Sequence, residues 1–300
     1  MSSRFRMHRL RPGARIQVVA PAGPFDQVEF ERGVERLRRR YDVYYAPSIA
    51  EREGYFAGSD ERRAGELLAA VRDRYVQGIV AARGGYGATR LLDRIDAELV
   101  AKNPKLLVGF SDITALHALW ARAGMGSIHG PMVAALGRCN DAQLARWIAA
   151  VEGTLPPTIT GLTALAGGRA QGPLLGGNLA VLSALIGTPY APPLAGCVLF
   201  LEDVGERPYR VDRMLTSWAH AGWLALPCAI VLGGFTEAEP GEDGTGVEHV
   251  LQERLGGLGI PVLAGVPAGH VDDNLELPFG ATAVVDAGQG TLAFQDEASA

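Results

Sequence analysis

The sequence has few cysteines and no concentration of charge of one sign. Its three cysteines, Cys139, Cys197 and Cys228, lie far apart and form no CxxC pair. This spacing argues against a disulfide framework and against a structural zinc site. The 28 Lys and Arg residues nearly balance 33 Asp and Glu residues, for a net charge of −5 at pH 7. Because no basic stripe or acidic tail gathers this charge, nucleic acid is not expected as a partner.

A hydrophobic run of membrane-spanning length is also missing. The uncharged stretch 171–201 is interrupted by prolines, glycines and Asn178, which leaves only the short apolar core LAVLSALIG. A bilayer span needs about 20 largely apolar residues, so no membrane association is expected. The basic N-terminal segment is followed by an apolar stretch too short for a signal peptide. The sequence therefore predicts a soluble protein of the cytoplasm.

Motifs for nucleotide cofactors and metals are missing as well. The glycine-rich run RGGYG (83–87) matches neither GxGxxG nor GxxxxGK[ST]. The histidines show no HExxH or related spacing, and the acidic run 237–244 has the Pro and Gly content of a solvated loop. No cofactor and no metal site are predicted.

What the sequence does contain is ample material for folded domains. It has 300 residues, 48% of them hydrophobic and 20% charged, which suits two ordinary domains with buried cores. In the first half, β-rich runs such as VQGIVAA (76–82) and KLLVGF (105–110) alternate with stretches of helical periodicity. Such alternation predicts an α/β domain with a parallel, flavodoxin- or Rossmann-like sheet. The second half is richer in strand-like runs and glycine, which predicts a smaller β-rich domain.

The predicted division of the chain follows from a change in composition. The segment 153–172 is rich in Thr, Pro and Gly, as expected of a linker or of the first strand of a second domain. We therefore expect an N-terminal α/β domain over 1–155, a linker over 156–172 and a β-rich C-terminal domain over 173–300.

Three chemically complementary side chains follow predicted buried strands. Ser111 comes after KLLVGF, Glu202 follows the run GCVLFL, and His270 follows IPVLAGVPAG. Ligands of parallel sheets bind beyond the carboxyl ends of the strands, so these positions are suited to a site. A hydroxyl, an imidazole and a carboxylate are the components of an activated serine nucleophile.

Each of these residues also has a simpler interpretation. Ser111 or its neighbour Asp112 could be a helix N-cap, and Glu202 could form an ion pair with a nearby arginine. His270 could be an ordinary loop histidine. The consecutive glycines of RGGYG allow backbone N–H groups to approach an oxyanion, but they equally suit a tight turn between a strand and a helix. The residue types and their positions in the sequence do not decide between a catalytic site and these simpler interpretations.

Several segments together resemble the LD-carboxypeptidase (muramoyl-tetrapeptide carboxypeptidase) family of serine peptidases. The resemblance covers about residues 15–285, in family order. GFSDI is not the GxSxG elbow of ordinary α/β-hydrolases, because glycine is missing two positions after Ser111. The segments that carry the resemblance are VVAPAG, RGGYGATRLL, GFSDITALH, HGPM, LLGGNL, LIGTP, LEDVGERPYRVDRML and GVPAGH.

The resemblance implies a metal-free Ser-His-Glu peptidase that releases a terminal D-alanine from murein tetrapeptides during cell-wall recycling. Matching motif to motif, Ser111 is the nucleophile, His270 the base and Glu202 the orienting acid, with Asp203 and Glu206 as competitors for the acid. The oxyanion hole falls on the backbone N–H groups of Asp112 and Gly85. The family places its active site between an α/β and a β-rich domain, and homodimers are usual in it.

Other readings of the residues stay open. Arg83, Arg90 and Arg207 are candidates for binding the terminal carboxylate of the substrate, and the sequence does not choose among them. One rival function is that of the microcin-C self-immunity peptidases, which cleave a peptidyl-nucleotide. Because Tyr190 is the only aromatic residue between 160 and 199, a loop that grips a nucleobase is not evident, and a murein peptide is favoured. A rival of another class is a non-catalytic α/β protein that binds a small ligand.

Overall fold

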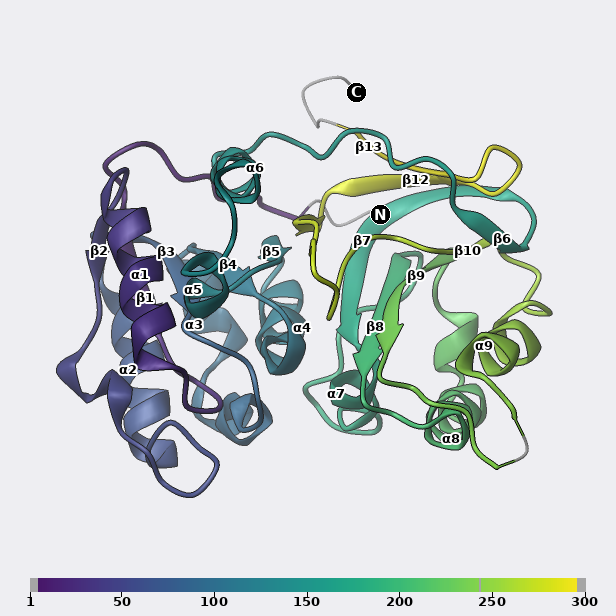
Figure 1. The fold of residues 1–300 in the computed structure, drawn as a ribbon, viewed down its shortest axis with the longest axis horizontal. Helices are drawn as coiled ribbons and strands as arrows, with labels where there is room; N and C mark the ends of the chain where they lie inside the picture. Colours follow the sequence, from purple (N-terminus) through teal and green to yellow (C-terminus); the bar gives the residue numbers. More distant parts are fainter. Residues whose placement is uncertain (1–4, 243, 296–300) are drawn as a thin grey trace. The chain divides into compact units, whose positions relative to one another are not determined.

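A computed structural model describes residues 5–242 and 244–295 (Figure 1). The chain forms two compact units. The first contains the residues up to Thr154 together with Glu276–Pro278, and the second contains Leu155–Leu275 together with the residues from Phe279 onward. Each unit has its own sheet, and each is described here by itself.

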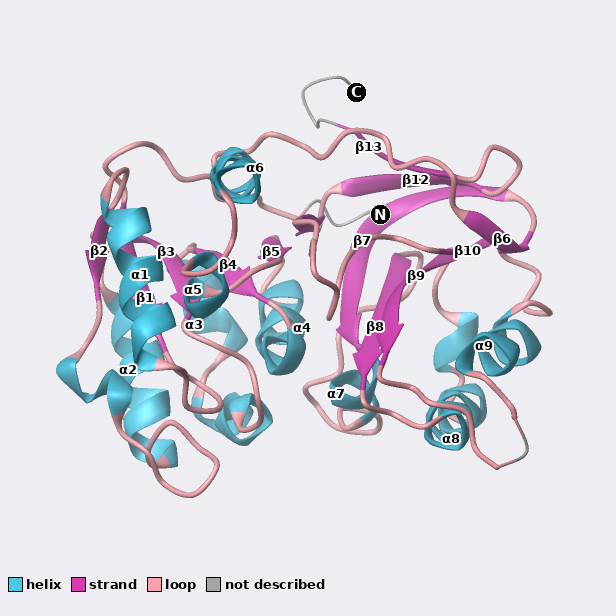
Figure 2. Cartoon of the chain, viewed as in Figure 1, coloured by secondary structure: helices cyan, strands magenta, loops and turns pink. Residues whose placement is uncertain are grey.

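The first unit contains a six-stranded sheet whose strands lie in the order β11-β5-β4-β3-β1-β2 (Figure 2). The pairs β2/β1, β1/β3, β3/β4 and β4/β5 are all parallel. The order 2-1-3-4-5 is that of flavodoxin-like sheets, in which ligands bind at the switch point beyond the ends of β1 and β3. The strands are β1 (Arg15–Val19), β2 (Asp42–Tyr44), β3 (Val76–Ala81), β4 (Leu106–Gly109), β5 (Ser127–His129) and β11 (Leu277–Phe279).

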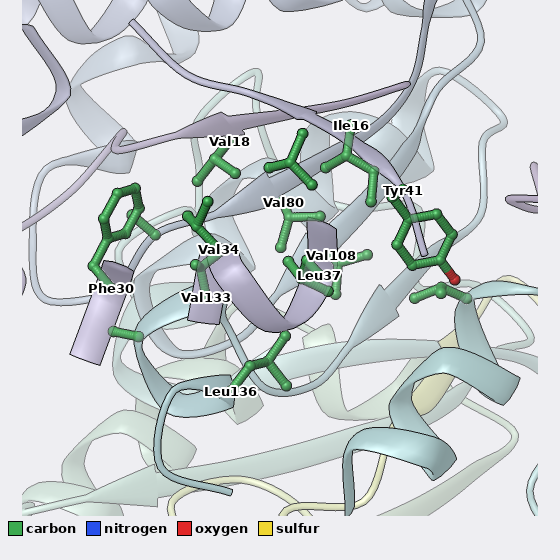
Figure 3. Close-up of a cluster of buried hydrophobic side chains, with 14 of the residues drawn as sticks. Ile16, Val18, Phe30, Val34, Leu37, Tyr41, Val80, Val108, Val133 and Leu136 are labelled. Carbon is green, nitrogen blue, oxygen red and sulfur yellow. The ribbon is translucent and has the colours of Figure 1, made fainter. Parts of the chain in front are cut away.

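Helices pack on this sheet, and a hydrophobic core lies beneath α1 and α5 (Figure 3). Ile16 and Val18 of β1 belong to this core together with Phe30 and Leu37 of α1. Because successive strand side chains alternate in direction, Gln17, which lies between Ile16 and Val18, faces the opposite side of the sheet. The helices of this unit are α1 (Gln27–Arg38), α2 (Asp60–Arg72), α3 (Ala97–Lys102), α4 (Thr114–Arg122), α5 (Val133–Leu136) and α6 (Asp141–Val151), with 3₁₀ turns η1 (Pro47–Ala50), η2 (Ala88–Arg94) and η3 (Ser111–Ile113).

Local sequence signals explain where the longer of these helices begin. Asp26 is the N-cap of α1 and accepts a hydrogen bond from the Glu29 backbone N–H, 2.9 Å away. Ser59 is the N-cap of α2 and accepts from the Arg62 N–H. An N-cap of this kind contributes about 1 kcal/mol to helix stability because it satisfies an otherwise unpaired N–H group.

The second unit contains a seven-stranded sheet in the order β13-β12-β7-β8-β9-β10-β6. Its central strands β7, β8, β9 and β10 are parallel, whereas β12, β13 and β6 pair antiparallel with their neighbours. The strands are β6 (Thr163–Ala166), β7 (Arg169–Asn178), β8 (Val198–Val204), β9 (Ala229–Thr236), β10 (Val262–Ala264), β12 (Thr282–Asp286) and β13 (Thr291–Gln295).

The long strand β7 joins the two parts of this sheet. Residues 169–173 pair with β12, and residues 174–178 pair with β8. Gly176, at φ +144°, is required here because a Cβ would lie 1.9 Å from the Phe200 carbonyl oxygen. In the structure the segment 156–172, which the sequence suggested as a linker, contains β6 and the first residues of β7.

Helices also accompany the parallel strands of the second unit, where α8 and α9 pack against each other. Within residues 5–242 and 244–295, no helix combines the length and apolar character needed to cross a membrane. The helices are α7 (Leu179–Ser183), α8 (Pro208–His220) and α9 (Val247–Leu255), with a 3₁₀ turn η4 (Trp223–Ala225). The predicted fold class is confirmed: a parallel-sheet α/β unit is followed by a second, strand-rich unit.

Candidate active site

Ser111 occupies an unusual backbone conformation at the carboxyl end of β4. Its φ is +62°, in the left-handed region that residues other than glycine seldom adopt. The N-caps of η3 and α4 are Phe110 and Ile113, so Ser111 is not the helix cap that the simpler interpretation assigned to it. The side chain of Ser111 is partly exposed. A strained, accessible serine directly after a buried parallel strand is a candidate nucleophile.

Asp112 is buried and ties the Ser111 turn to the glycine turn RGGYG. Its Oδ2 accepts a hydrogen bond of 2.7 Å from the Ala88 backbone N–H. Burial raises the pKa of the Asp112 carboxyl to about 6, while the hydrogen bond from Ala88 and the positive charge of Arg63 act in the opposite direction. The carboxylate of Asp112 is therefore structural, and only its backbone N–H belongs to the predicted oxyanion hole.

The glycine turn lies directly against Ser111. A Cβ on Gly84 would lie 2.9 Å from the Ser111 Cβ and 3.0 Å from its Oγ. The Gly84 carbonyl accepts a hydrogen bond of 3.0 Å from the Gly23 N–H. In a trans peptide the N–H and C=O point in opposite directions, so the Gly85 N–H points away from Gly23. Gly85 itself is at φ +110°. The loops after β1, β3 and β4 thus meet at the switch point of the sheet.

We predict that Gly84→Ala lowers kcat by about 10- to 100-fold, because the new methyl group would displace Ser111 by several tenths of an ångström. The global fold should survive, since the crowding is confined to one side chain. Steady-state kinetics and thermal unfolding of the purified variant test this prediction.

Gly65→Ala is the matched control for Gly84→Ala. Gly65 is an exposed residue of α2, and a Cβ there meets no described atom within 4 Å. This control should keep full activity and gain about 0.5–1 kcal/mol in the free energy of unfolding. Full activity in Gly84→Ala would contradict the proposed closeness of the turn to the reacting oxygen.

Sequence reasoning missed Arg63, which holds the glycine turn from inside the protein. Arg63 lies in α2 and its side chain is fully buried. Its guanidinium donates to the carbonyl oxygens of Pro21 and of Gly87, the latter at 2.9 Å, and pairs with Asp60. Arginine is normally a surface residue, so only the tertiary structure reveals this role. Arg63 connects the loops that follow β1 and β3.

In the second unit, Glu202 and His270 form a hydrogen-bonded pair. Glu202 lies in β8 and its side chain is completely buried, whereas the side chain of His270 is 21% exposed. The distance from His270 Nδ1 to Glu202 Oε2 is 2.7 Å. Because an ionised carboxylate only accepts hydrogen bonds, Nδ1 carries the proton. A buried carboxylate that fixes the tautomer of a partly exposed imidazole is the arrangement that a general base requires.

The backbone conformation next to His270 allows the chain to pack closely against Glu202. Gly269 has a φ of +104°, and a Cβ there would lie 2.7 Å from both Cβ and Oε2 of Glu202. The Gly269 N–H donates to Asn274 Oδ1 at 2.9 Å. The Thr236 hydroxyl donates to the His270 carbonyl at 3.1 Å, which anchors the loop to β9. Glycine before His270 is therefore a packing requirement of the Glu202–His270 pair.

The two competing acids have other partners. Asp203 accepts hydrogen bonds from the Ala180 N–H at 2.9 Å and from Asn178 Nδ2 at 3.0 Å, so it fixes the start of α7. Burial raises the pKa of Asp203 to about 6. Glu206 is paired with Arg210 at 3.5 Å. Of the three acids, Glu202 is the one whose carboxylate contacts His270.

His117 supports β4, the strand that precedes Ser111. It lies in α4, and its Nε2 is 2.9 Å from the Gly109 carbonyl at the end of β4. A carbonyl only accepts, so Nε2 carries the proton and Nδ1 accepts from the Ser127 hydroxyl at 2.7 Å. Burial, aided by the neighbouring His129, lowers the pKa of His117 to about 3. His117 is a structural residue that is neutral at physiological pH.

This pKa predicts a pH dependence of stability. Between about pH 6.5 and pH 3, the unfolded chain binds a proton at His117 that the folded chain does not bind, so stability falls as the pH falls. The difference in free energy of unfolding between the native chain and His117→Gln should therefore decrease on acidification, by about 1.4 kcal/mol per pH unit. Urea unfolding of both proteins at several pH values from 7 to 4 measures this. Free energies of unfolding that change equally with pH in the two proteins would contradict this prediction.

The predicted site residues thus fall into two groups, one in each unit. Ser111, Asp112 and Gly85 come together in the first unit, and Glu202 contacts His270 in the second. Among residues 5–242 and 244–295, no three His, Cys, Asp or Glu side chains are grouped in a way that could hold a metal ion. Each group suggests the chemistry of a hydrolase. The first unit has a strained serine beside a glycine turn, and the second has an imidazole whose orientation is fixed by a carboxylate.

Comparison with known proteins identifies the family. The model of the LD-carboxypeptidase N-terminal domain matches residues 16–130, and that of the C-terminal domain matches residues 171–285. The chain belongs to the LD-carboxypeptidase family, and it is a peptidase of that family.

Individual relatives agree with this assignment. The murein tetrapeptide carboxypeptidase of Pseudomonas aeruginosa is 31% identical over 290 residues, which covers 91% of this chain and 93% of the relative. A crystal structure of muramoyltetrapeptide carboxypeptidase from Oxalobacter formigenes superposes with a TM-score of 0.82 at 32% identity, covering 94% of this chain and 99% of that one. The structure of MccF in complex with glutamyl sulfamoyl guanosine superposes with a TM-score of 0.88 at 22% identity, covering 98% and 99%, and shows the shared fold.

Proposed function

We propose that this protein is a serine carboxypeptidase that releases the terminal D-alanine from murein tetrapeptides. The observation that carries the serine mechanism is the 2.7 Å hydrogen bond between His270 and the buried Glu202. The choice of substrate is supported by the relatives named for murein tetrapeptide cleavage. In this proposal Ser111 is the nucleophile, His270 the general base and Glu202 the residue that orients it.

The first half of the reaction forms an acyl-enzyme. Ser111 Oγ attacks the carbonyl carbon of the amide before D-alanine while its proton passes to His270 Nε2. The proposal requires these two atoms to come within hydrogen-bond distance at that moment. The backbone N–H groups of Gly85 and Asp112 donate to the oxyanion, and loss of one such donor typically raises the barrier by about 3 kcal/mol. The protonated His270 then gives its proton to the nitrogen of D-alanine as the C–N bond breaks.

The second half regenerates the serine. Water attacks the ester carbonyl and gives a proton to His270, and the ester bond to Ser111 Oγ breaks. His270 returns that proton to Oγ, so the imidazole ends neutral. Glu202 stabilises the imidazolium in both halves through its hydrogen bond to Nδ1.

A carboxypeptidase must also bind the terminal carboxylate of its substrate, and the geometry favours Arg83. Arg90 is paired with the carboxylate of Asp60 at 2.7 Å, whereas Arg83 Nη1 donates to a neutral group, the Pro24 carbonyl, at 2.8 Å. The exposed Arg83 precedes Gly84, and its Nη1 would lie 3.5 Å from a Cβ on Gly23 and 3.9 Å from one on Gly85. Its guanidinium therefore lies beside the turn that contacts Ser111.

We predict that Arg83→Gln raises KM about 10-fold or more with a smaller change in kcat, because a charge-assisted hydrogen bond to the carboxylate is lost. Steady-state kinetics with the tetrapeptide measures this. Arg207→Gln, which changes an exposed arginine of the second unit, is the comparison variant. A larger rise in KM for Arg207→Gln than for Arg83→Gln would transfer the role to Arg207.

Mass spectrometry of the products tests the function directly. Purified protein is incubated with murein tetrapeptide and, separately, with a peptidyl-adenylate. Release of D-alanine from the tetrapeptide, unchanged by EDTA, is the expected result. Cleavage of the peptidyl-adenylate alone would replace the proposal with a peptidyl-nucleotide peptidase, and cleavage of neither would overturn the proposed substrate.

The cellular setting is part of the same proposal. We propose that the protein acts in the cytoplasm, in cell-wall recycling, and as a homodimer. Light scattering during size-exclusion chromatography tests the dimer. Fractionation of cells followed by immunodetection tests the compartment.

A further inference from the structure

A short segment late in the chain is inserted into the first unit. Residues 276–278, called here the inserted segment, belong to the first unit, although the chain on both sides of them belongs to the second. Their strand, β11, is an edge strand of the first sheet, next to β5. Just before the segment the Leu275 N–H donates to the Pro267 carbonyl at 2.9 Å, and just after it the Gly280 N–H donates to the Leu174 carbonyl at 2.7 Å. Both flanks of the inserted segment are therefore bonded within the second unit.

An ion pair anchors the inserted segment in the first unit. The Glu276 side chain is 1% exposed, and its Oε2 accepts a hydrogen bond of 2.8 Å from Nε of Arg146 in α6. A Cβ on Gly130, the residue after β5, would lie 3.1 Å from Glu276 Cγ. Burial of a carboxylate is unfavourable unless a charge partner is held in good geometry, and the best-attested use of such a buried pair is to fix register. Because β11 has only three residues, the ion pair supplies the register that so short a strand specifies weakly.

On the first-unit side, Glu276 is connected to the strand that precedes Ser111. Gly130, which packs against Glu276, donates its N–H to the Gly109 carbonyl at 3.1 Å. The same carbonyl accepts from His117 Nε2 at 2.9 Å. Gly109 is the last residue of β4, and Ser111 follows it by two positions. The anchor of the inserted segment and the nucleophile are thus joined through one hydrogen bond and one packing contact.

On the second-unit side, the chain leads from Glu276 straight to the loop of His270. Glu276 follows His270 by six positions. The Gly269 N–H donates to Asn274 Oδ1 at 2.9 Å, and the hydrogen bond of the Leu275 N–H closes the same loop. This closed loop ends one residue before Glu276. A change in the position of Glu276 is therefore transmitted to His270 instead of being absorbed by a flexible connection.

We infer that Glu276 and Arg146 are positioning residues for His270, an inference that rests on the proposed function. The proposed reaction requires Ser111 Oγ and His270 Nε2 to meet, although the two residues belong to different units. The ion pair fixes the chain that carries His270 beside β5, next to the strand that presents Ser111. Neither Glu276 nor Arg146 is assigned a contact with the substrate. Both act through the placement of the general base, because small errors in its position lower the rate of proton transfer.

Steady-state kinetics with murein tetrapeptide tests this role. Glu276→Gln, which keeps the volume of the buried side chain, should lower kcat about 10-fold and leave KM within about twofold of the native value. Arg146→Met should cause a similar loss, whereas Arg146→Lys, which keeps the positive charge, should retain kcat within about threefold of native. Equal values of kcat in Arg146→Met and Arg146→Lys, both native, would contradict the inference.

Glu152→Gln is the matched control for Glu276→Gln. It weakens another ion pair of the first unit, the one between Glu152 and Arg40, which lies outside the path from Glu276 to Ser111. This control should keep the native kcat. Equal losses of kcat in Glu152→Gln and Glu276→Gln would reveal a general effect of ion-pair loss and overturn the positioning role.

A double-mutant cycle with His270 separates positioning from a general loss of stability. Because Glu276 acts through His270, Glu276→Gln should leave the residual rate of His270→Ala unchanged. A further loss of about 10-fold in the His270→Ala background, which is what independent effects would give, overturns the inference. If Glu276→Gln does not fold, Arg146→Met takes its place in the cycle, since the Arg146 side chain is 32% exposed.

A binding measurement separates this inference from the proposed function. Calorimetry with Ser111→Ala protein should give the same Kd for the tetrapeptide with and without Glu276→Gln, and a loss of affinity as large as the loss of kcat would overturn the positioning role. If the native enzyme releases D-alanine and His270→Ala does not, a native kcat in Glu276→Gln overturns this inference alone. If the native enzyme releases no D-alanine, the proposed function and this inference fall together.

Discussion

Replacing Ser111 with alanine is expected to lower D-alanine release from murein tetrapeptide by at least about 10⁴-fold. Without the hydroxyl no acyl-enzyme can form, and the remaining catalysis comes only from binding and the oxyanion donors. The variant should fold, because Ser111 is a partly exposed residue and is not the N-cap of η3 or of α4. Alanine and serine both carry a Cβ, so the positive φ at this position is about as unfavourable for alanine as it is for serine. A stopped assay for free D-alanine measures the loss.

Covalent labelling provides a second test of Ser111 as the nucleophile. The native enzyme should form a covalent adduct with a serine-reactive fluorophosphonate, and Ser111→Ala should not, as seen by mass spectrometry of the intact protein. Ser127→Ala serves as a control, because Ser127 is a buried serine that bonds to His117. It should keep the adduct at Ser111. Retention of more than a few per cent of activity in Ser111→Ala would end the assignment of Ser111 as nucleophile.

Changing Glu202 to glutamine is expected to lower kcat by about 10³- to 10⁴-fold with little change in KM. The amide keeps the volume of the buried side chain but no longer stabilises the imidazolium, and it can donate to Nδ1 and so favour the wrong tautomer of His270. The loss should reside in the chemical steps, because Glu202 is fully buried and does not face solvent. Steady-state kinetics with the tetrapeptide gives kcat and KM separately.

The competing acids provide the controls for Glu202. Glu206→Gln removes only an ion pair with Arg210 and should leave kcat near the native value. Asp203→Asn disturbs the start of α7, so it should lower the free energy of unfolding by about 1 kcal/mol while affecting kcat far less than Glu202→Gln does. If Asp203→Asn lost more activity than Glu202→Gln, the acid role would pass to Asp203.

Much of the fold was predictable because it depends on local patterns. The run 76–82 reads as a buried strand, and the structure has β3 at Val76–Ala81. Ser59 is the N-cap of α2, and serine is one of the residue types that local rules favour at this position. The segment 156–172 was harder, because its Thr-, Pro- and Gly-rich composition hides strands β6 and β7 that form only through pairing with distant partners. Glu276–Pro278 shows the same limit, since this short segment belongs to the first unit despite its late place in the chain.

The candidate site was likewise predictable only in part from the sequence. Glu202 and His270 were expected to follow buried strands directly. In the structure Glu202 lies within β8 and His270 lies six residues beyond the end of β10, and the two side chains are hydrogen bonded. Asp112 was expected to be a possible helix cap, but its carboxylate holds the glycine turn instead. Arg63 carried no sequence signal, since an arginine in a helix is an ordinary surface residue until its contacts are known.

By itself the sequence determined which segments form buried strands and which polar residues lie at or beyond their carboxyl ends, because hydrophobic periodicity and glycine placement are local properties of the chain. Only the tertiary structure decided which of those residues contact one another: that His270 pairs with Glu202 rather than Asp203, and that Gly84 lies against Ser111. The physical reason is that hydrogen bonds and van der Waals contacts depend on distances of a few tenths of an ångström. Such distances are set by the packing of segments that are remote in sequence, as Glu202 and His270 are.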